Sequence, residues 1–226
     1  MDDPNLTIIA IDGPVAAGKS TIGRILSQKL GYRFVDTGEM YRALTWKAMK
    51  LNVDLEDETE LSRLASSTKI DFISTVKGNE RHCAVLVDGQ DVTEEIHTQG
   101  VEVGVSLVSK VGGVRKVMVE QQRRLAQDGK IVMAGRDIGT TVLPHAQLKI
   151  YLSASSEERA RRRYLEVIER GEAADYQTIL AELMRRDEID SQRSISPLEP
   201  APDAKMVDTD GLNPDQVLAG IIRMTE

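Results

Sequence analysis

A phosphate-binding loop pattern near the N-terminus constrains the fold more than any other feature of this chain. The pattern G-x-x-x-x-G-K-[ST] spans residues 13–20. A short β-branched run, residues 6–11, leads into the loop, and apolar residues at helical spacing follow it up to Gly31, at a helix C-cap position. This context distinguishes a nucleotide-binding loop from a glycine-rich turn beside a surface lysine. The sequence therefore predicts a triphosphate-binding loop between a buried parallel strand and a helix.

Each residue type in the loop suits phosphate binding. Gly13 and Gly18 allow backbone conformations in which N–H groups converge on phosphate oxygens at a helix N-terminus. Lys19 is expected to lie along the β- and γ-phosphates, and the Ser20 hydroxyl is expected to bind Mg²⁺. The pattern alone indicates nucleotide binding and leaves open what happens to the γ-phosphate.

Composition limits the class of protein. The chain has 226 residues, enough for one main domain with a smaller insert, and its formal net charge of −7 argues against a nucleic-acid partner. One cysteine excludes an intramolecular disulfide, and the three histidines show no metal-ligand spacing. No apolar run is long enough to span a membrane, and residues 1–4 are acidic where a signal peptide would be basic. We expect a cytoplasmic protein that acts on a metabolite.

Candidate strands alternate with helices along the chain, which predicts a parallel α/β sheet. Besides the first strand, strands are expected at residues 32–36, 131–134, 148–152 and 205–208. Between residues 68 and 97 the pattern changes to short strands joined by tight turns, including Asp88-Gly89. We therefore predict a core of residues 1–67 and 98–226 that carries a small antiparallel insert at 68–97.

Polar residues follow two of the predicted strands. Asp36 and Thr37 begin a run to Arg42 at the carboxyl end of the second strand, where ligands of doubly wound sheets bind. Arg42 would pair with a phosphate and Asp36 would hold Mg²⁺ through water, but a helix N-cap at Asp36 is the alternative. Arg136 and Asp137 follow another buried strand and are expected at the same edge, with a surface ion pair as the alternative.

A basic run begins another predicted helix. Arg159, Arg162 and Arg163 fall at i, i+3 and i+4 and share one face, whereas Arg161 does not. Three guanidinium groups on one face would neutralise a transferring phosphoryl group. Two glutamates precede the run, so a solvated, salt-bridged helix face is the alternative.

Taken together, the motifs resemble the bacterial cytidylate kinase (CMP kinase) family. The resemblance spans nearly the whole chain and rests on the phosphate loop, Asp36-Thr37-Gly38 with Tyr41-Arg42, Gly135-Arg136-Asp137, and Arg186-Asp187 through Asp190 and Arg193 to Ser196-Pro197-Leu198. It implies a P-loop NTPase-type α/β fold: a parallel sheet flanked by helices, the antiparallel β insert in the monophosphate-binding region, and a mobile helical lid near residues 155–173. The implied reaction is ATP + (d)CMP giving ADP + (d)CDP, with Mg²⁺ as cofactor and a monomeric enzyme.

The resemblance also implies roles for individual residues. Catalytic roles fall on Lys19, Asp36, Arg159, Arg162 and Arg163. ATP would contact Gly13, Pro14, Val15, Ala16, Ala17, Gly18, Lys19, Ser20 and Thr21, and Mg²⁺ would contact Ser20 and Asp36. CMP would contact Thr37, Tyr41, Arg42, Ser106, Arg115, Arg136, Asp137, Arg186, Asp190 and Arg193. Among these, Asp137 would accept from the cytosine amino group, so UMP, which presents an acceptor there, is expected to be a poor substrate.

Three alternative classes remain open on sequence grounds. Another P-loop kinase, acting on shikimate or a different monophosphate, shares most of these motifs. A regulatory GTPase is suggested by residues 68–71, which resemble a guanine-reading T-K-x-D, although the D-x-x-G at 208–211 follows this motif instead of preceding it. A P-loop protein without catalytic activity is the third class.

Overall fold

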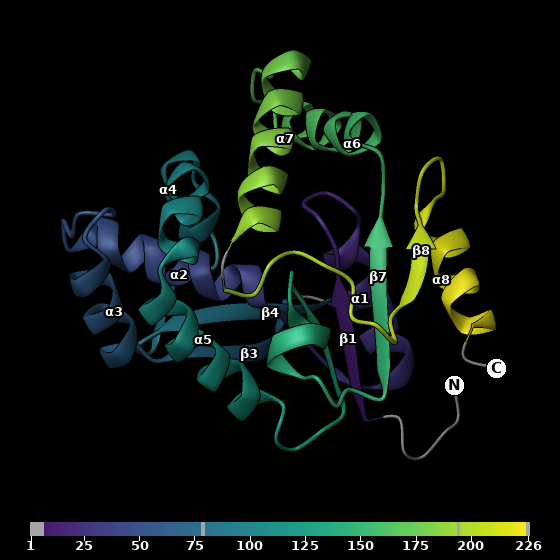
Figure 1. Ribbon diagram of the computed structural model, residues 1–226, viewed down its shortest axis with the longest axis horizontal. Coiled ribbons are helices and arrows are strands. Elements are labelled where there is room, and N and C mark those ends of the chain that lie inside the picture. The colour runs from purple at the N-terminus through teal and green to yellow at the C-terminus, as the bar shows by residue number, and fades with distance from the viewer. Residues whose placement is uncertain (1–6, 78–79, 194, 225–226) are drawn as a thin grey trace. The chain divides into compact units, whose positions relative to one another are not determined.

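The computed structural model describes residues 7–77, 80–193 and 195–224 (Figure 1). The chain divides into two compact units, the first formed by Met1–Phe34 with Gly129–Glu226 and the second by Val35–Asp128. The first unit contains β1 (Ile8–Asp12), α1 (Lys19–Leu30), β6 (Ile131–Ala134), η2 (Ile138–Val142), β7 (Leu148–Ser153), α6 (Ser156–Glu169), α7 (Tyr176–Gln192), β8 (Lys205–Asp208) and α8 (Pro214–Arg223). Strand β2 (Arg33–Asp36) begins in the first unit and ends in the second.

A five-stranded sheet in the order β2-β6-β1-β7-β8 forms the centre of the first unit. The pairings of β1 with β6 and β7, and of β7 with β8, are parallel. Strands β1 and β6 are buried almost throughout, which accounts for their continuous apolar sequences. Figure 1 shows α8 beside β8 and the carboxyl end of β7 directed towards α6. The predicted parallel sheet flanked by helices is confirmed.

The predicted strands and the first helix agree closely with the structure. Strands β6 and β8 have the predicted bounds, and β7 extends one residue beyond them. Helix α1 ends at Gly31, whose φ of 67° is the left-handed conformation expected at a C-cap. Strand β1 begins at Ile8; Leu6 and the acidic residues 1–4 lie outside the described residues.

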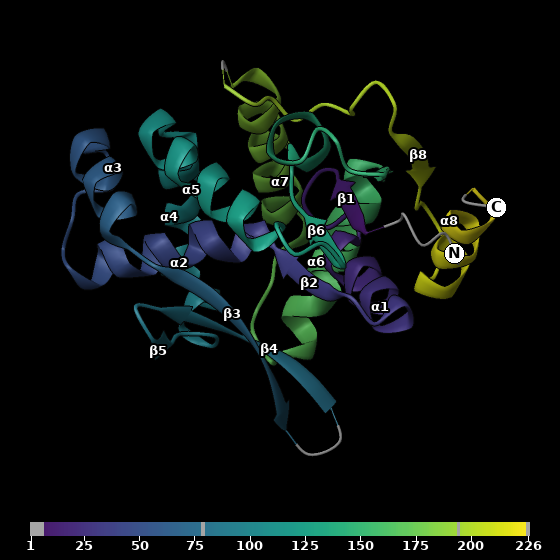
Figure 2. The same cartoon turned by 90° about the horizontal axis from the view of Figure 1, so that it is seen from below.

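The second unit joins helices to a small antiparallel sheet. It contains α2 (Thr37–Lys50), α3 (Glu58–Ser67), β3 (Ile70–Lys77), β4 (Glu80–Val87), β5 (Gln90–Asp91), η1 (Glu95–His97), α4 (Gln99–Lys110) and α5 (Gly112–Leu125). Strands β3, β4 and β5 pair in that order, both pairings antiparallel, and Figure 2 shows them as a bent ribbon. Asp88 and Gly89 have φ values of 51° and 86°, as a tight hairpin turn requires.

The boundary between the units differs from the predicted insert of residues 68–97. The strands of the hairpin bury Val85 in a core that also contains Leu44 of α2, Leu61 of α3 and Met118 of α5. Because these apolar side chains share one core, the helices and the hairpin form a single compact unit, Val35–Asp128.

Helix α6 occupies most of the segment near residues 155–173 in which a lid is predicted, and α7 follows that segment. They pack on each other, with the rings of Tyr164 and Tyr176 edge to face at 6.4 Å. The helical nature of the segment is confirmed, and its closure over a substrate stays a prediction. None of the helices among the described residues is long and apolar enough to cross a membrane.

Candidate active site

The phosphate loop is held tightly against the sheet. A Cβ atom on Gly13, whose φ is 143°, would lie 2.1 Å from the carbonyl oxygen of Leu152 on β7. Gly18 is the N-cap of α1 with φ 92°, and no acidic side chain lies in the first turn of this helix. Both positions, 13 and 18, therefore require glycine. Because no carboxylate of the first turn neutralises the positive N-terminus of α1, this helix end can attract an anion.

Lys19 reaches back across this loop. The residue is 9% exposed, and its Nζ donates a hydrogen bond to the carbonyl oxygen of Pro14 at 2.6 Å. Ser20 follows in the first turn of α1. The ammonium group thus lies over the loop that is predicted to hold the phosphates of ATP.

Asp190 on α7 orients two of the predicted CMP-binding arginines. Its carboxylate contacts Arg136 Nε at 2.6 Å and Arg193 Nη1 at 3.5 Å. Burial alone would raise the pKa of Asp190, but the attraction of Arg136 and Arg193 lowers it below its usual value. Arg136 Nη1 also lies 3.5 Å from the carbonyl oxygen of Gly13. An ionised carboxylate therefore holds two guanidinium groups, and that of Arg136 lies beside the phosphate loop.

Among the predicted lid arginines, Arg159 lies against the phosphate loop. It is 3% exposed, and its Nη1 contacts Asp187 Oδ2 at 2.7 Å and the carbonyl oxygen of Val15 at 3.4 Å. Its Nη2 donates to the hydroxyl of Ser156. Protein contacts thus fix a cation at the phosphate loop.

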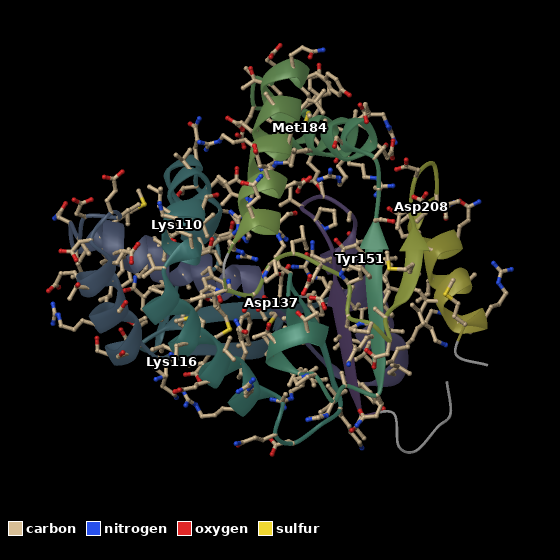
Figure 3. All side chains as sticks on the ribbon, viewed as in Figure 1. Lys110, Lys116, Asp137, Tyr151, Met184 and Asp208 are labelled. Carbon is tan, nitrogen blue, oxygen red and sulfur yellow. The ribbon has the colours of Figure 1, made fainter. Side chains whose placement is uncertain are left out.

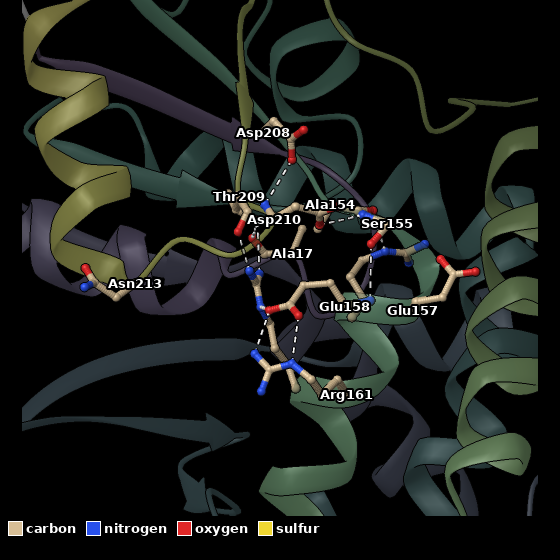
Figure 4. Close-up of polar contacts among 12 residues, drawn as sticks. Ala17, Ala154, Ser155, Glu157, Glu158, Arg161, Asp208, Thr209, Asp210 and Asn213 are labelled. Carbon is tan, nitrogen blue, oxygen red and sulfur yellow. Dashed lines mark hydrogen bonds and ion pairs between the residues drawn. The ribbon is translucent and has the colours of Figure 1, made fainter.

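Arg162 and Arg163 make different contacts. Arg162 donates to Glu158 and to the hydroxyl and carbonyl oxygens of Thr209, whereas Arg163 pairs with Glu166. Arg161, expected on another face of α6, pairs with the same Glu158 (Figure 4). In this structure these three arginines form the salt-bridged helix face that the sequence left open, and their action on a phosphoryl group stays a prediction.

A groove adjoins these arginines. It has a volume of about 460 Å³ and is lined by Ser155, Glu157, Glu158, Arg161, Tyr176, Asp210 and Gly211. Figure 4 shows the N-terminus of α6 beside the loop that carries Thr209 and Asp210. Asp210 accepts from the backbone N–H of Ser155 at 2.8 Å, which ties the two sides together. Thr209 Oγ1 also lies 3.4 Å from the carbonyl oxygen of Ala17, so the groove is close to the phosphate loop.

The second unit carries the other predicted CMP residues. Arg115 is 3% exposed, and its guanidinium carbon lies 5.7 Å from the centroid of the buried Tyr41 ring. Arg42 pairs with Glu102 of α4 at 3.4 Å. Thr37 is buried in the first turn of α2, and Ser106 is half-buried on α4. The residues assigned to CMP are therefore divided between the two units.

Asp36 caps helix α2, as one interpretation of the sequence expected. Its carboxylate accepts a hydrogen bond from the N–H of Gly38 at 2.9 Å. The described residues include no group of three His, Cys, Asp or Glu side chains that would hold a metal ion by themselves. Ser20 and Asp36 offer oxygen ligands, and Mg²⁺ bound to phosphates needs only one or two from the protein. The donor chemistry fits the predicted ion.

Sequence reasoning missed Asp12, which is buried between the phosphate loop and the loop after β6. Its carboxylate accepts from the N–H groups of Ile138 and Gly139, both at 2.7 Å. Burial raises the pKa of Asp12 to about 6, with the charge of Asp137 adding to the rise and the hydrogen bonds and Lys19 opposing it. A carboxylate ending a buried apolar strand was the available signal.

Tyr151 on β7 lies among the same charges. Burial raises the pKa of Tyr151, and the charges of Asp12 and Asp187 add to the rise. Figure 3 labels this tyrosine and Asp137, which is 6% exposed. The site in the first unit thus combines a phosphate loop, buried carboxylates and fixed cations, an arrangement suited to binding phosphates and stabilising charge during their transfer.

The segment that resembles a guanine-reading motif has a structural role in the second unit. Thr68 is buried, and its hydroxyl donates to the carbonyl oxygen of Leu64 at 2.6 Å. Lys47 and Gln121 donate to the hydroxyl and carbonyl oxygens of Thr68. These contacts fix the end of α3, and all of them are made with other residues of the second unit.

Comparison with known sequences gives one consistent family. Residues 9–226 match the family model described as cytidylate kinase. The chain is 49% identical over 218 residues to a cytidylate kinase of Bacillus velezensis, covering 96% of each chain, and 49% identical to one of Pelotomaculum thermopropionicum, covering 95% and 93%. Among solved structures, a shikimate kinase from Bacteroides thetaiotaomicron aligns with a TM-score of 0.49 at 12% identity, covering 97% of this chain and 98% of that one.

Proposed function

The chain belongs to the cytidylate kinase family, and we propose that it transfers the γ-phosphoryl group of ATP to CMP and dCMP, giving ADP and CDP or dCDP. The observation that carries the proposal is the match to this family over nearly the whole chain, at close to half of all positions identical. The phosphate loop and the arginines beside it supply the chemistry that the reaction requires.

The loop at residues 13–21 is proposed to hold the phosphates of ATP. Its backbone N–H groups and the N-terminus of α1 favour anions, and Lys19 adds a buried cation across the loop. The groove beside α6 offers room for the nucleoside of ATP. A divalent ion, for which Mg²⁺ is proposed, would be held by Ser20 and Asp36 and would supply charge neutralisation at the phosphates.

The acceptor is proposed to lie beside Arg136, Asp137 and Arg193. The two arginines are pre-oriented by Asp190, so their guanidinium groups lose little freedom when they bind a phosphate. Arg186, which lies on α7 with Asp190, would add positive charge. In the second unit, Arg42 would pair with the phosphate of CMP. Asp137 is buried, so it can distinguish CMP from UMP by hydrogen bonding. Opposite uracil its buried carboxylate would have no donor to pair with, which is costly.

A coupled assay of ADP formation tests the function. With ATP as donor, CMP and dCMP should be converted with kcat/KM at least about ten-fold above that of UMP, and AMP should also be poor. The absence of ATP turnover with all of these acceptors would contradict the proposal. A preference for AMP or UMP would show that the acceptor is a nucleoside monophosphate other than CMP. A monomeric state, a cytoplasmic location and the absence of a nucleic-acid partner stay predictions.

A further inference from the structure

Asp12 connects two loops of the first unit for which different functions are proposed. It ends β1 directly before Gly13, the first residue of the phosphate loop. Its two carboxylate oxygens accept hydrogen bonds from the backbone N–H groups of Ile138 and Gly139, each at 2.7 Å. These two residues directly follow Asp137, for which we propose cytosine recognition. One buried side chain therefore holds the loop for CMP against the start of the loop for ATP.

Two further contacts tie the same loops together. The N–H of Gly135 donates to the carbonyl oxygen of Ile11 at 2.9 Å, and Arg136 Nη1 lies 3.5 Å from the carbonyl oxygen of Gly13. Both contacts lie on the N-terminal side of the proposed cytosine-reading residue, whereas those of Asp12 lie on its C-terminal side. The backbone on both sides of that residue is thus held against β1.

The environment of Asp12 requires both of its oxygens. The residue is 3% exposed, and each oxygen faces a backbone N–H group that has no alternative in water. An asparagine would offer one oxygen and turn an amide donor towards the other N–H group. Space is equally restricted, because a Cβ on Gly139 would lie 3.2 Å from Asp12 Oδ2. The titratable groups that face this carboxylate are Lys19 of α1, Asp137, and Lys149 and Tyr151 of β7.

We propose that Asp12 is a positioning residue for phosphoryl transfer, whose carboxylate sets Arg136 and Asp137 towards CMP by binding the backbone that follows them. The proposal rests on the proposed function, because it needs this loop to hold CMP. Both oxygens of Asp12 are occupied by backbone N–H groups, so in this role Asp12 would act through the backbone and not by touching a substrate. An ionised Asp12 accepts both hydrogen bonds, so its protonation should weaken the use of CMP more than the use of ATP.

The variant Asp12→Asn tests this role. We expect kcat/KM for CMP to fall about ten-fold or more, while KM for ATP stays within about two-fold. In the wild-type protein, kcat/KM for CMP should fall on acidification in a step centred near pH 6, the raised pKa of Asp12. The variant should lack this step. Any change caused by the titration of CMP itself should occur in both proteins. Asp215→Asn is the matched control, because Asp215 is an exposed carboxylate in the first turn of α8 in the same unit; it should leave both measurements unchanged.

Gly139→Ala disturbs the same contact, because its Cβ would lie 3.2 Å from Asp12 Oδ2. This variant replaces Asp12→Asn as the test if Asp12→Asn does not fold. It should show the same selective loss on CMP. Wild-type kcat/KM and pH dependence in a folded Asp12→Asn protein, or in Gly139→Ala alone if the first is unfolded, would overturn the proposal. Equal losses for ATP and CMP that follow a lowered Tm would also overturn it, since they indicate a structural role. An inactive wild-type protein would instead refute the proposed function, and this proposal with it.

Discussion

At the scale of single residues, Lys19 is where transfer is expected to be most sensitive. Its ammonium is fixed over the phosphate loop by Pro14, 2.6 Å away, so it is preorganised for negative charge. We expect Lys19→Ala to lower kcat by about 10²–10³-fold, the usual effect of losing one preorganised charge-stabilising group. CMP affinity, measured by titration calorimetry, should be nearly unchanged.

The control for this variant is Lys29→Ala in the last turn of the same helix, where the lysine is exposed. It should retain wild-type kinetics. Near-normal turnover of Lys19→Ala would show that the loop lysine does not stabilise the transferred group.

Asp137 is the residue on which the choice of base should depend. Replacing it by Asn keeps its size and one acceptor but removes the charge that strengthens the hydrogen bond. We expect Asp137→Asn to lose efficiency on CMP and to narrow the CMP-to-UMP ratio of kcat/KM by about ten-fold, equivalent to ~1.4 kcal/mol. An unchanged ratio together with a collapsed kcat would move this residue from base recognition to the transfer step.

The local structure of the site was predictable where a contiguous motif carries it. The loop glycines and the position of Lys19 follow from spacing alone, because the motif is built from neighbouring residues. Asp12 could not be assigned, because its partners are backbone N–H groups 126 and 127 residues further along the chain. The pairing of Arg42 with Glu102 is equally invisible, since 60 residues separate them and only packing of α2 against α4 brings them together.

At the scale of elements, helix α6 combines one buried arginine with a charged surface. Arg161 is 58% exposed at its side chain and Arg162 is 21% exposed, although both pair with Glu158. If Arg162 acts during transfer, Arg162→Ala should lower kcat more than it raises either KM, whereas Arg161→Ala should be nearly silent. Steady-state kinetics with both substrates measure this difference. Equal effects, or normal kinetics with a small loss of stability, would leave only a salt-bridge role.

Glu158 should make the stability of α6 depend on pH. The hydrogen bonds and charges of Arg161 and Arg162 outweigh burial and lower the pKa of Glu158 from 4.5 to about 2. Its contribution is therefore complete above pH 4.5 and is lost as the pH falls towards 2. We expect Glu158→Gln to lower the free energy of unfolding by about 1 kcal/mol at pH 7, because both arginines remain partly solvated.

Urea unfolding at pH 7 and pH 3 measures this effect. The difference between wild type and Glu158→Gln should be smaller at pH 3. Glu166→Gln is the matched control, since Glu166 is 53% exposed and pairs with Arg163 on the same helix; it should change stability by less than about 0.5 kcal/mol. A difference that grows on acidification would contradict the assignment of the low pKa.

The elements themselves were largely predictable from sequence. Strand β6 is an apolar run between Lys130 and Gly135, and the Asp88-Gly89 turn admits few conformations. The ion pairs of α6 were not predictable from sequence. Helical spacing gives only the direction in which a side chain leaves the helix, and a long arginine side chain can reach any of several nearby carboxylates.

At the scale of the whole molecule, the two compact units have boundaries that sequence periodicity does not mark. The antiparallel strands read as a separate insert because their period differs from that of the surrounding helices. Their apolar faces are nevertheless covered by α2, α3 and α5, so the compact unit extends over Val35–Asp128. Periodicity reports which face of an element is buried and carries no information on which elements bury it.

CMP should stabilise the folded protein against unfolding, and Arg42 should contribute to that effect. A ligand at 100 times its Kd adds about 2.7 kcal/mol to the free energy of unfolding. Arg42 belongs to the second unit, and losing a charge-assisted phosphate contact costs about 2–3 kcal/mol. For Arg42→Ala, Kd should therefore rise about 100-fold, and the same CMP concentration should add only about 0.4 kcal/mol. Arg63→Ala, which removes an arginine 74% exposed at its side chain in the same unit, is the control and should keep the full effect. Thermal unfolding with and without CMP measures all three proteins, and full stabilisation of Arg42→Ala would show that CMP is held without this arginine.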